Sequence, residues 1–231
     1  MHPANENLVF RSYQKNDYAA LKAAMQATYP NIENAYLPQY DMDLLSDLYP
    51  ESQIVCTLDN VLIGAILTRI VPRYKYVENS TEADILNVNY FVEDTRHGDS
   101  IFTLDYIVLP EYRRLKIGQK LQQHFQQVVF KDNFYHIIGA SRLVNYHKYQ
   151  KDMNIETYVE KVKSGEIIDP TLGFHLSNKL IAGAILYNFC PEDVECCGFA
   201  LCATVANPDF MPAVAVYPQR LQNLANLGLI Y

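Results

Sequence analysis

The sequence predicts an α/β fold in which a mixed, mostly antiparallel central sheet is flanked by helices. Short runs of β-branched and aromatic residues, typical of strands, occur along the same chain as segments whose apolar residues recur at helical spacing. Two of the strand-like runs, residues 53–57 and 61–70, are joined by Leu58-Asp59-Asn60, which is typical of an antiparallel hairpin. Together these patterns favour a sheet with helices packed against it.

The 231 residues are expected to form one domain, with a core from about residue 7 to residue 206 and a tail from 207 to 231. The content of 49% hydrophobic and 19% charged residues is typical of a globular enzyme. A net charge of −7 argues against a general nucleic-acid binder, and no apolar run approaches the roughly 20 residues of a membrane span. The N-terminal residues lack the pattern of a secretion signal, so we expect a cytoplasmic protein without a membrane partner.

The number and spacing of the cysteines indicate reduced, buried thiols. An odd number without a leader peptide favours a reducing compartment, and the spacing fits no common zinc pattern. Two of them are adjacent, so in a strand they would face opposite sides and could not easily share a metal. We therefore expect no metal site among Cys56, Cys190, Cys196, Cys197 and Cys202.

The first half of the chain is predicted to begin with a strand, followed by two helices and the hairpin. The strand covers residues 7–12, and the helices cover about 17–29 and 41–49. These helices are well placed to form the wall of an acceptor pocket, although each of their tyrosines, taken alone, is better explained as an ordinary core or surface residue. Aromatic lining of that pocket would come from Tyr29, Tyr36, Tyr40 and Tyr49. Residues 71–99, rich in charge and tyrosine, are interpreted as an insertion or loop at the sheet edge, near the substrate.

The second half alternates strands and helices. Asn154 is the expected N-cap of one helix, which ends at Gly165, and Asp169-Pro170 begins another. The predicted strands are residues 101–109, 135–141, 180–188 and 197–205, and the predicted helices are 118–130, 154–165, 169–178 and a short tail helix carrying Leu221, Leu224 and Leu227.

Residues 101–130 organise the chain: a strand, a short basic loop and the start of a helix. The loop reads Arg113-Arg114-Leu115-Lys116-Ile117-Gly118. Its amides are expected to point outward as unpaired donors, and the dipole of the following helix favours an anion there. The arrangement is typical of a pyrophosphate site, whereas the alternative for the basic side chains is a solvated surface.

The motif Val108-x-Pro110-x-x-Arg113-Arg114-x-x-x-Gly118 resembles the loop of the GNAT family of acetyl-CoA-dependent N-acetyltransferases. The family loop has Arg or Gln, two residues, Gly, one residue, then Gly or Ala. Lys116 therefore stands where the inner glycine would permit a positive φ and a close approach to phosphate. Four further segments, within a span of about residues 95 to 210, resemble a GNAT subgroup often attached to a carbon–nitrogen hydrolase domain: residues 146–149 (YHKY), 156–162 (ETYVEKV), 169–178 (DPTLGFHLSN) and 191–199 (PEDVECCGF). Nothing in this chain resembles the hydrolase part.

The resemblance implies a GNAT fold with acetyl-CoA as co-substrate and no metal. Backbone N–H groups from Arg114 to Gln119 would bind the pyrophosphate, and the backbone from Tyr106 to Leu109 would lie along the pantetheine arm. The predicted cofactor-binding residues are Tyr106, Ile107, Val108, Leu109, Arg113, Arg114, Leu115, Lys116, Ile117, Gly118, Gln119 and Lys120.

Four residues are candidates for catalysis. Asp105 is the acid within the central strand and could act through water as the base, unless it is a surface acid or an ion-pair partner. Asn145 and Tyr146, in the loop after the next strand, are alternatives. The family alignment places His175 where many members carry the tyrosine that protonates the leaving thiolate, and the alternative is a core histidine.

The expected function is transfer of an acetyl group from acetyl-CoA to a primary amine of a small molecule or peptide by direct attack. The alternative is a non-catalytic acyl-CoA-binding or regulatory module of the same fold. A homodimer is an open alternative to a monomer. A different nucleotide-phosphate protein is disfavoured because the chain lacks a Walker loop and a dinucleotide fingerprint.

Overall fold

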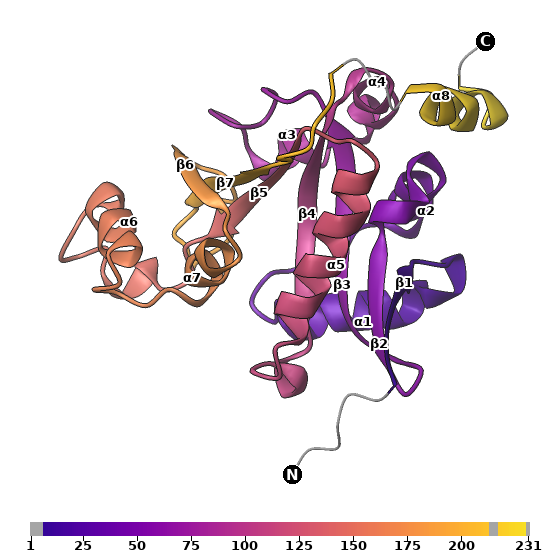
Figure 1. Ribbon diagram of the computed structural model, residues 1–231. Helices are drawn as coiled ribbons and strands as arrows, with labels where there is room; N and C mark the ends of the chain where they lie inside the picture. The colour runs from indigo at the N-terminus through magenta and orange to yellow at the C-terminus, as the bar shows by residue number, and fades with distance from the viewer. Residues whose placement is uncertain (1–6, 213–216, 230–231) are drawn as a thin grey trace.

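A computed structural model describes residues 7–212 and 217–229, and a seven-stranded sheet lies at its centre (Figure 1). The strand order is β1-β2-β3-β4-β5-β7-β6, and β4 and β5 are the parallel pair among antiparallel neighbours. The mixed, mostly antiparallel sheet predicted from the sequence is confirmed. The strands are β1 (Leu8–Ser12), β2 (Ile54–Leu58), β3 (Val61–Val71), β4 (Ser100–Val108), β5 (His136–Arg142), β6 (Ile181–Leu186) and β7 (Ala200–Ala206).

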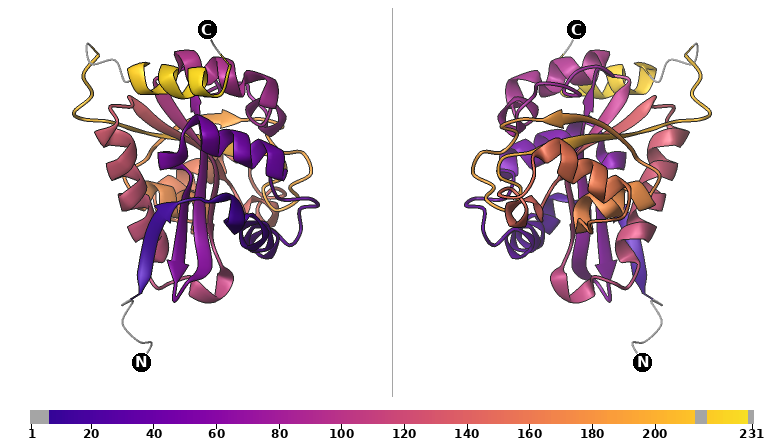
Figure 2. Two further views of the ribbon diagram at one scale, coloured as in Figure 1. Left: turned by 90° about the vertical axis from the view of Figure 1, so that its right-hand side faces the viewer. Right: turned by 90° about the vertical axis from the view of Figure 1, so that its left-hand side faces the viewer.

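Helices cover both faces of the sheet (Figures 1 and 2). Val55 on β2 packs in a cluster with residues of α1, α2, α4 and α8, whereas its neighbours Ile54 and Cys56 pack with residues of α5. This alternation follows from the two-residue period of a strand. The helices are α1 (Tyr18–Thr28), α2 (Gln39–Leu48), α3 (Glu82–Ile85), α4 (Phe91–His97), α5 (Ile117–Lys131), α6 (Ile155–Lys163), α7 (Pro170–Ser177) and α8 (Tyr217–Asn226).

The hairpin β2–β3 forms as predicted. Asp59 and Asn60, between the strands, have φ of 50° and 66°. Two successive positive φ values are the geometry of the tight hairpin turn that matches the strand twist, and Asp and Asn tolerate it best after glycine.

A β-bulge in β4 opens the sheet. Along the β3–β4 pair, Leu67 faces Asp105 and Thr68 faces Thr103, so Leu104 is an extra residue on β4. The pairing of β4 with β5 covers only residues 101–103 and ends where this bulge begins. Because a bulge bends its strand, β4 and β5 diverge beyond it (Figure 1) and leave a wedge in the middle of the sheet.

The inserted segment between β3 and β4 does not lie at a sheet edge, so that interpretation was wrong. It carries α3 and α4 onto the face of the central strands, where Phe91 joins the α1–α2 core cluster. The physical reason is Arg69 on β3, which is 2% exposed and needs a counter-charge. Asp94 of α4 supplies it at 2.5 Å and also binds Lys75 at 2.7 Å.

The helix signals in the C-terminal half are confirmed. Asn154 caps α6 by accepting a hydrogen bond from the Thr157 N–H, and Asp169 caps α7 through Thr171 and Leu172. β7 begins at Ala200 rather than at residue 197.

Cys196 and Cys197 lie in a turn before β7, not in the strand, and Cys197 has φ of 52°. Asp193, which is 2% exposed, stabilises this turn by accepting a hydrogen bond from the Glu195 N–H. In the tail helix α8, Leu224 is buried among the α1–α2 cluster. Of the other two leucines named for this helix, the side chain of Leu221 lies outside the described ones, and Leu227 is exposed.

Candidate functional site

The wedge between β4 and β5 is the floor of a cleft of about 1990 Å³. Its walls come from the loop after α1, from α3, β4 and the loop before α5, and from β5, α7 and the loop after β6. The five cysteines are free, and four of them are buried. Within residues 7–212 and 217–229, no group of His, Cys, Asp or Glu is arranged to hold a metal, and no helix is long and apolar enough to cross a membrane.

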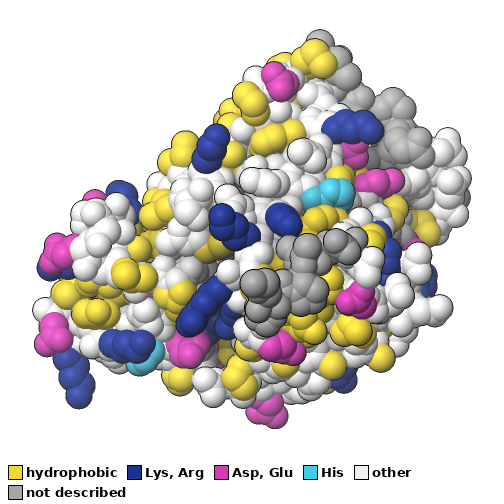
Figure 3. Space-filling view, turned by 60° about the horizontal axis from the view of Figure 1, so that its bottom comes forward, with side chains coloured by type: hydrophobic (Ala, Val, Ile, Leu, Met, Phe, Trp, Pro, Cys, Tyr) yellow, Lys and Arg dark blue, Asp and Glu magenta, His cyan; other side chains and the backbone are white. Residues whose placement is uncertain are grey.

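The loop before α5 presents backbone donors to this cleft. Arg114 and Lys116 have φ of 66° and 59°, and Lys116 is the N-cap residue of α5. The first backbone bond of the helix runs from Lys120 N–H to Lys116 oxygen, and no N–H from Arg114 to Gln119 donates to an acceptor in the described part of the chain. These donors and the helix dipole form an anion site. Figure 3 shows several Lys and Arg side chains near the middle of the face that comes forward when the bottom of Figure 1 is turned toward the viewer.

Lys116 adopts the left-handed conformation that the family glycine would permit. For a residue with a Cβ, this conformation costs roughly 1–2 kcal/mol. The backbone path of the loop is therefore kept despite the substitution, at some cost in stability.

Eight of the twelve predicted cofactor-binding residues line the cleft: Tyr106, Val108, Arg113, Arg114, Lys116, Ile117, Gly118 and Gln119. Leu109 donates its N–H to Ile63 of β3, and N–H directions alternate along a strand. The N–H of Ile107 therefore also points to β3, whereas those of Tyr106 and Val108 point into the wedge. Leu115 and Lys120 do not line the cleft.

Aromatic packing fixes the start of α5 against α7. The Tyr106 hydroxyl donates a hydrogen bond to the Gly118 carbonyl, and the Tyr106 and Phe174 rings lie 5.0 Å apart. A Cβ on Gly118 would lie 3.2 Å from the Phe174 ring. Gly118 is thus needed for this close approach rather than for a positive φ, which it does not have.

Asp105 lies on the cleft wall, on the face of the sheet that carries α1. The Tyr29 hydroxyl, just after the end of α1, lies close to its carboxylate. Burial raises the pKa of Asp105 to about 7; the nearby charge of Glu82 also raises it, while Tyr29 and Arg142 oppose the shift. A carboxylate that titrates near pH 7 is suited to act as a general base.

His175 lines the same cleft from α7. Its Nδ1 atom is buried and has no hydrogen-bond partner in the described part of the chain. Burial lowers its pKa to about 4, so the ring is neutral at pH 7. A histidine ordinarily titrates near pH 6.5, and the pKa of His175 is lower because α7 packs the ring away from bulk water.

Tyr146 does not reach the cleft. Its ring is buried against Tyr158 and Phe199, and its hydroxyl donates to the Met153 carbonyl at 3.3 Å. Asn145 does line the cleft, and its amide group donates to the Ile168 carbonyl at 2.9 Å.

The predicted aromatic lining is present only in part. Tyr29 and Tyr36 line the cleft. Tyr40 is 75% exposed, and Tyr49 is buried in the core cluster under α5, so neither contributes.

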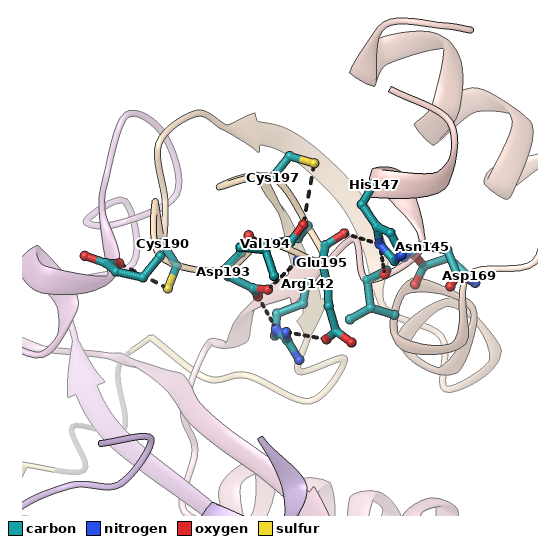
Figure 4. A network of polar contacts seen from close by, with 12 residues as sticks. Arg142, Asn145, His147, Asp169, Cys190, Asp193, Val194, Glu195 and Cys197 are labelled. Atoms are coloured by element: carbon teal, nitrogen blue, oxygen red, sulfur yellow. Dashed lines mark hydrogen bonds and ion pairs between the residues drawn. The ribbon is translucent and has the colours of Figure 1, made fainter. Parts of the chain in front are cut away.

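Sequence reasoning missed the charged residues of the far wall. Arg142 at the end of β5 forms ion pairs with Asp193 at 2.5 Å and with Glu195 at 3.0 Å (Figure 4). Glu82 of α3 lies on the same wall. No local sequence motif predicts these residues, because they come from separate segments of the chain. The acidic residues around position 193 were the one pattern in the sequence that could have indicated them.

Comparison with known proteins identifies the family. The acetyltransferase (GNAT) family pattern matches residues 18–153. The chain is 28% identical over 209 residues to a Bacillus subtilis protein named "Probable hydrolase YhcX", covering 90% of this chain but only 40% of that protein. It is 25% identical over 173 residues to the "Uncharacterized N-acetyltransferase YkwB" of Bacillus subtilis, covering 74% of this chain and 76% of that protein.

The solved structure of the GphF GNAT-like decarboxylase in complex with isobutyryl-CoA superposes with a TM-score of 0.74 at 20% identity, over 86% of this chain and 99% of that one. At this identity the likeness concerns the fold. With the family pattern covering more than half of the sequence, the chain belongs to the GNAT acetyltransferase family.

Proposed function

We propose that this protein transfers the acetyl group of acetyl-CoA to a primary amine of a small molecule or peptide by direct attack. Membership of the GNAT family supports an acyltransferase. The observation that carries the proposal is the row of N–H groups from Arg114 to Gln119, which have no acceptor among the described residues and lie at the same cleft as Asp105. Cofactor and base would thus act in one continuous space.

The loop would hold the cofactor mainly through its backbone. Each N–H bond to a charged phosphate oxygen contributes about 1.5–3 kcal/mol, and the dipole of α5 adds about 0.3–1 kcal/mol. The N–H groups of Tyr106 and Val108, which point into the wedge, would receive the pantetheine arm and the acetyl oxygen. A donor at that oxygen stabilises the charge that develops in the transition state.

Asp105 would remove the proton from the acceptor ammonium, directly or through one water. The neutral nitrogen then attacks the thioester carbon, forming the C–N bond. Collapse of the tetrahedral intermediate breaks the C–S bond and releases the CoA thiolate, while the nitrogen loses its second proton, which passes to the thiolate directly or through water. Tyr29, whose hydroxyl lies close to Asp105, would help to orient the carboxylate.

His175 would act at the leaving sulfur. Because its ring is neutral at pH 7, it would offer an N–H hydrogen bond to the thiolate rather than act as a strong acid. Tyr146 has no part in this scheme, since its hydroxyl is engaged away from the cleft.

Two alternative functions must be distinguished from acetyl transfer. A non-catalytic acyl-CoA-binding module is favoured by the low pKa of His175 and by Lys116 in the loop. A decarboxylase is suggested by the fold shared with GphF. A cytoplasmic location and a homodimer stay predictions from the sequence.

The experiment incubates the purified protein with acetyl-CoA and a panel of amines, and follows released thiol and acetylated amine. A parallel reaction with malonyl-CoA follows CO₂. We expect thiol release that depends on the amine. Tight acetyl-CoA binding without turnover would favour the binding module, and amine-independent CO₂ release from malonyl-CoA would favour the decarboxylase.

A further inference from the structure

The wedge between β4 and β5 has a narrow end as well as an open one. The parallel pairing of the two strands ends with Thr103 opposite Gly139. Beyond this pair the strands diverge (Figure 1), because the bulge at Leu104 bends β4. Thr103 and Gly139 therefore mark the apex of the wedge, and both line the cleft.

The path proposed for the cofactor leads to this apex. The diphosphate would bind the loop at residues 114–119, and the pantetheine arm would run along residues 106–109 of β4. From Val108 back through Tyr106, the strand reaches the bulge and then the apex. Because the rest of the cofactor would fill the open end of the wedge, the carbon chain of the acyl group would extend toward the narrow end.

Gly139 leaves open space at the apex. A Cβ added to this residue would have no heavy atom within 4 Å, apart from the glycine itself and its two chain neighbours. Carbon atoms of side chains in contact lie about 4.0–4.5 Å apart, so this space has room for at least one further carbon. Protein interiors are otherwise close-packed. The gap over Gly139 is thus a part of the cleft that a bound group could fill.

Neither packing nor backbone conformation requires a glycine at this position. At Gly64 on β3, by contrast, a Cβ would lie 2.8 Å from the Ile107 carbonyl oxygen. Gly139 has no positive φ, and its pairing with β7 is regular, without a bulge. A glycine inside a strand weakens the strand, and it often marks a bulge or a place where a ligand or another backbone approaches closely. Of these explanations, a ligand is the one that fits Gly139.

The space over Gly139 faces α5. Ile137, two residues earlier on β5, points to the same face of the sheet and packs with Phe125 of α5. Gln122, on the same helix, is 3% exposed and lines the cleft together with Ile137. Asp105, the acid of the neighbouring strand, lies on the opposite face, which carries α1. The surroundings suit a short hydrocarbon chain.

We propose that the acyl site takes a three- or four-carbon acyl group in addition to acetyl, with the carbons beyond the second one lying over Gly139. The inference rests on the proposed acyl transfer and names the donor. The C–N bond that forms, the C–S bond that breaks and the protons that leave the acceptor nitrogen are those of acetyl transfer. Only the group held at the apex differs.

Binding of the donor tests the acyl site without an acceptor. Calorimetry compares free CoA, acetyl-CoA, propionyl-CoA and butyryl-CoA. The Kd of butyryl-CoA should be at least fivefold lower than that of acetyl-CoA, and propionyl-CoA should lie between them, because each buried methylene group adds hydrophobic stabilisation. With any amine of the panel that is acylated, kcat/KM should follow the same order.

A glycine-to-alanine pair of variants locates the effect. Gly139→Ala fills the space with one carbon and meets no neighbour, so the variant should fold, and thermal unfolding verifies this. It should lower the ratio of the acetyl-CoA Kd to the butyryl-CoA Kd at least fivefold. Gly173→Ala makes the same change on α7, also in open space but outside the cleft lining, and should leave the ratio unchanged.

The outcomes separate this inference from the proposed function. Equal Kd values for acetyl-CoA and butyryl-CoA, or a preference for butyryl-CoA that Gly139→Ala leaves unchanged, would overturn the larger acyl group and leave acetyl transfer intact. Binding of every acyl-CoA without acylation of any amine would overturn the proposed function, and with it the role of these thioesters as donors.

Discussion

The two walls of the cleft are built in different ways. The proposed cofactor wall covers residues 106–119, and the donors that it offers are backbone N–H groups ahead of α5. The proposed acceptor wall is assembled from α1, α3, β4, β5 and the loop after β6, and it offers side chains such as Glu82, Asp105 and Arg142. From this difference we expect a backbone site to tolerate a side-chain change such as lysine for glycine, whereas one substitution should alter a side-chain site.

The largest expected effect is on the acceptor wall. Asp105→Asn should lower kcat by about 10²–10⁴-fold, because it removes the general base, with the acetyl-CoA Kd changed less than about threefold. Asp152→Asn, on an exposed turn, is the matched control. A normal rate for Asp105→Asn would show that another group accepts the proton.

The same residue predicts the pH dependence. A base must be ionised, so kcat/KM should rise with pH through about 7, the pKa of Asp105, and the Asp105→Asn variant should lose this rise.

The effect of pH on stability has the opposite sign. A pKa that is higher in the folded than in the unfolded state stabilises the fold at low pH, and this contribution disappears as pH rises from about 4 through 7. Thermal unfolding should therefore show Asp105→Asn gaining Tm relative to wild type above pH 7. A pH–rate profile without an inflection between pH 6 and 8 would contradict the assignment.

The next largest effect is expected at the cofactor wall, where Gly118 packs against Phe174. Gly118→Val should weaken acetyl-CoA binding at least tenfold, because the new side chain meets Phe174 and displaces α7 from the start of α5. Calorimetry measures this directly. Gly173→Ala, in α7 with open space around the added Cβ, should leave the affinity unchanged. Equal affinities for both variants would count against the loop as the cofactor site.

A smaller effect is expected at His175, on α7. His175→Ala should lower kcat by about three- to tenfold, as befits loss of one neutral hydrogen bond to the leaving sulfur, with the acetyl-CoA Kd within about twofold. His136→Ala, outside the cleft lining, serves as the control. If single-turnover kinetics were the same for wild type and His175→Ala, the histidine would have no role at the thiolate.

The smallest expected effect concerns Lys116, whose replacement separates the role of the loop backbone from that of the side chain. Lys116→Gly should raise the free energy of unfolding by about 0.5–1 kcal/mol, because glycine relieves the left-handed strain but has more freedom in the unfolded chain. Acetyl-CoA affinity should change by less than about threefold, since the donors are backbone groups. Urea unfolding measures the change in stability, and calorimetry measures the change in acetyl-CoA affinity. A large loss of affinity would show instead that the Lys116 ammonium contributes to binding.

The difference between the walls also explains what the sequence could predict. Helix caps such as Asn154 and Asp169, the turn Asp59-Asn60 and the strand–loop–helix of residues 101–130 are local signals, and each appears where it was predicted. The pairing of Arg69 with Asp94 and of Arg142 with Asp193 joins residues 25 and 51 positions apart, so no periodicity reveals it. The placement of the 72–99 segment, the burial of Tyr146 and the low pKa of His175 depend on such tertiary packing.

The most direct measurement of the central claim is a crystal structure with acetyl-CoA bound. The account predicts diphosphate oxygens within hydrogen-bonding distance of several N–H groups between Arg114 and Gln119, with the thioester in the wedge beside Asp105. A diphosphate bound away from that turn, with those N–H groups still facing solvent, would contradict it.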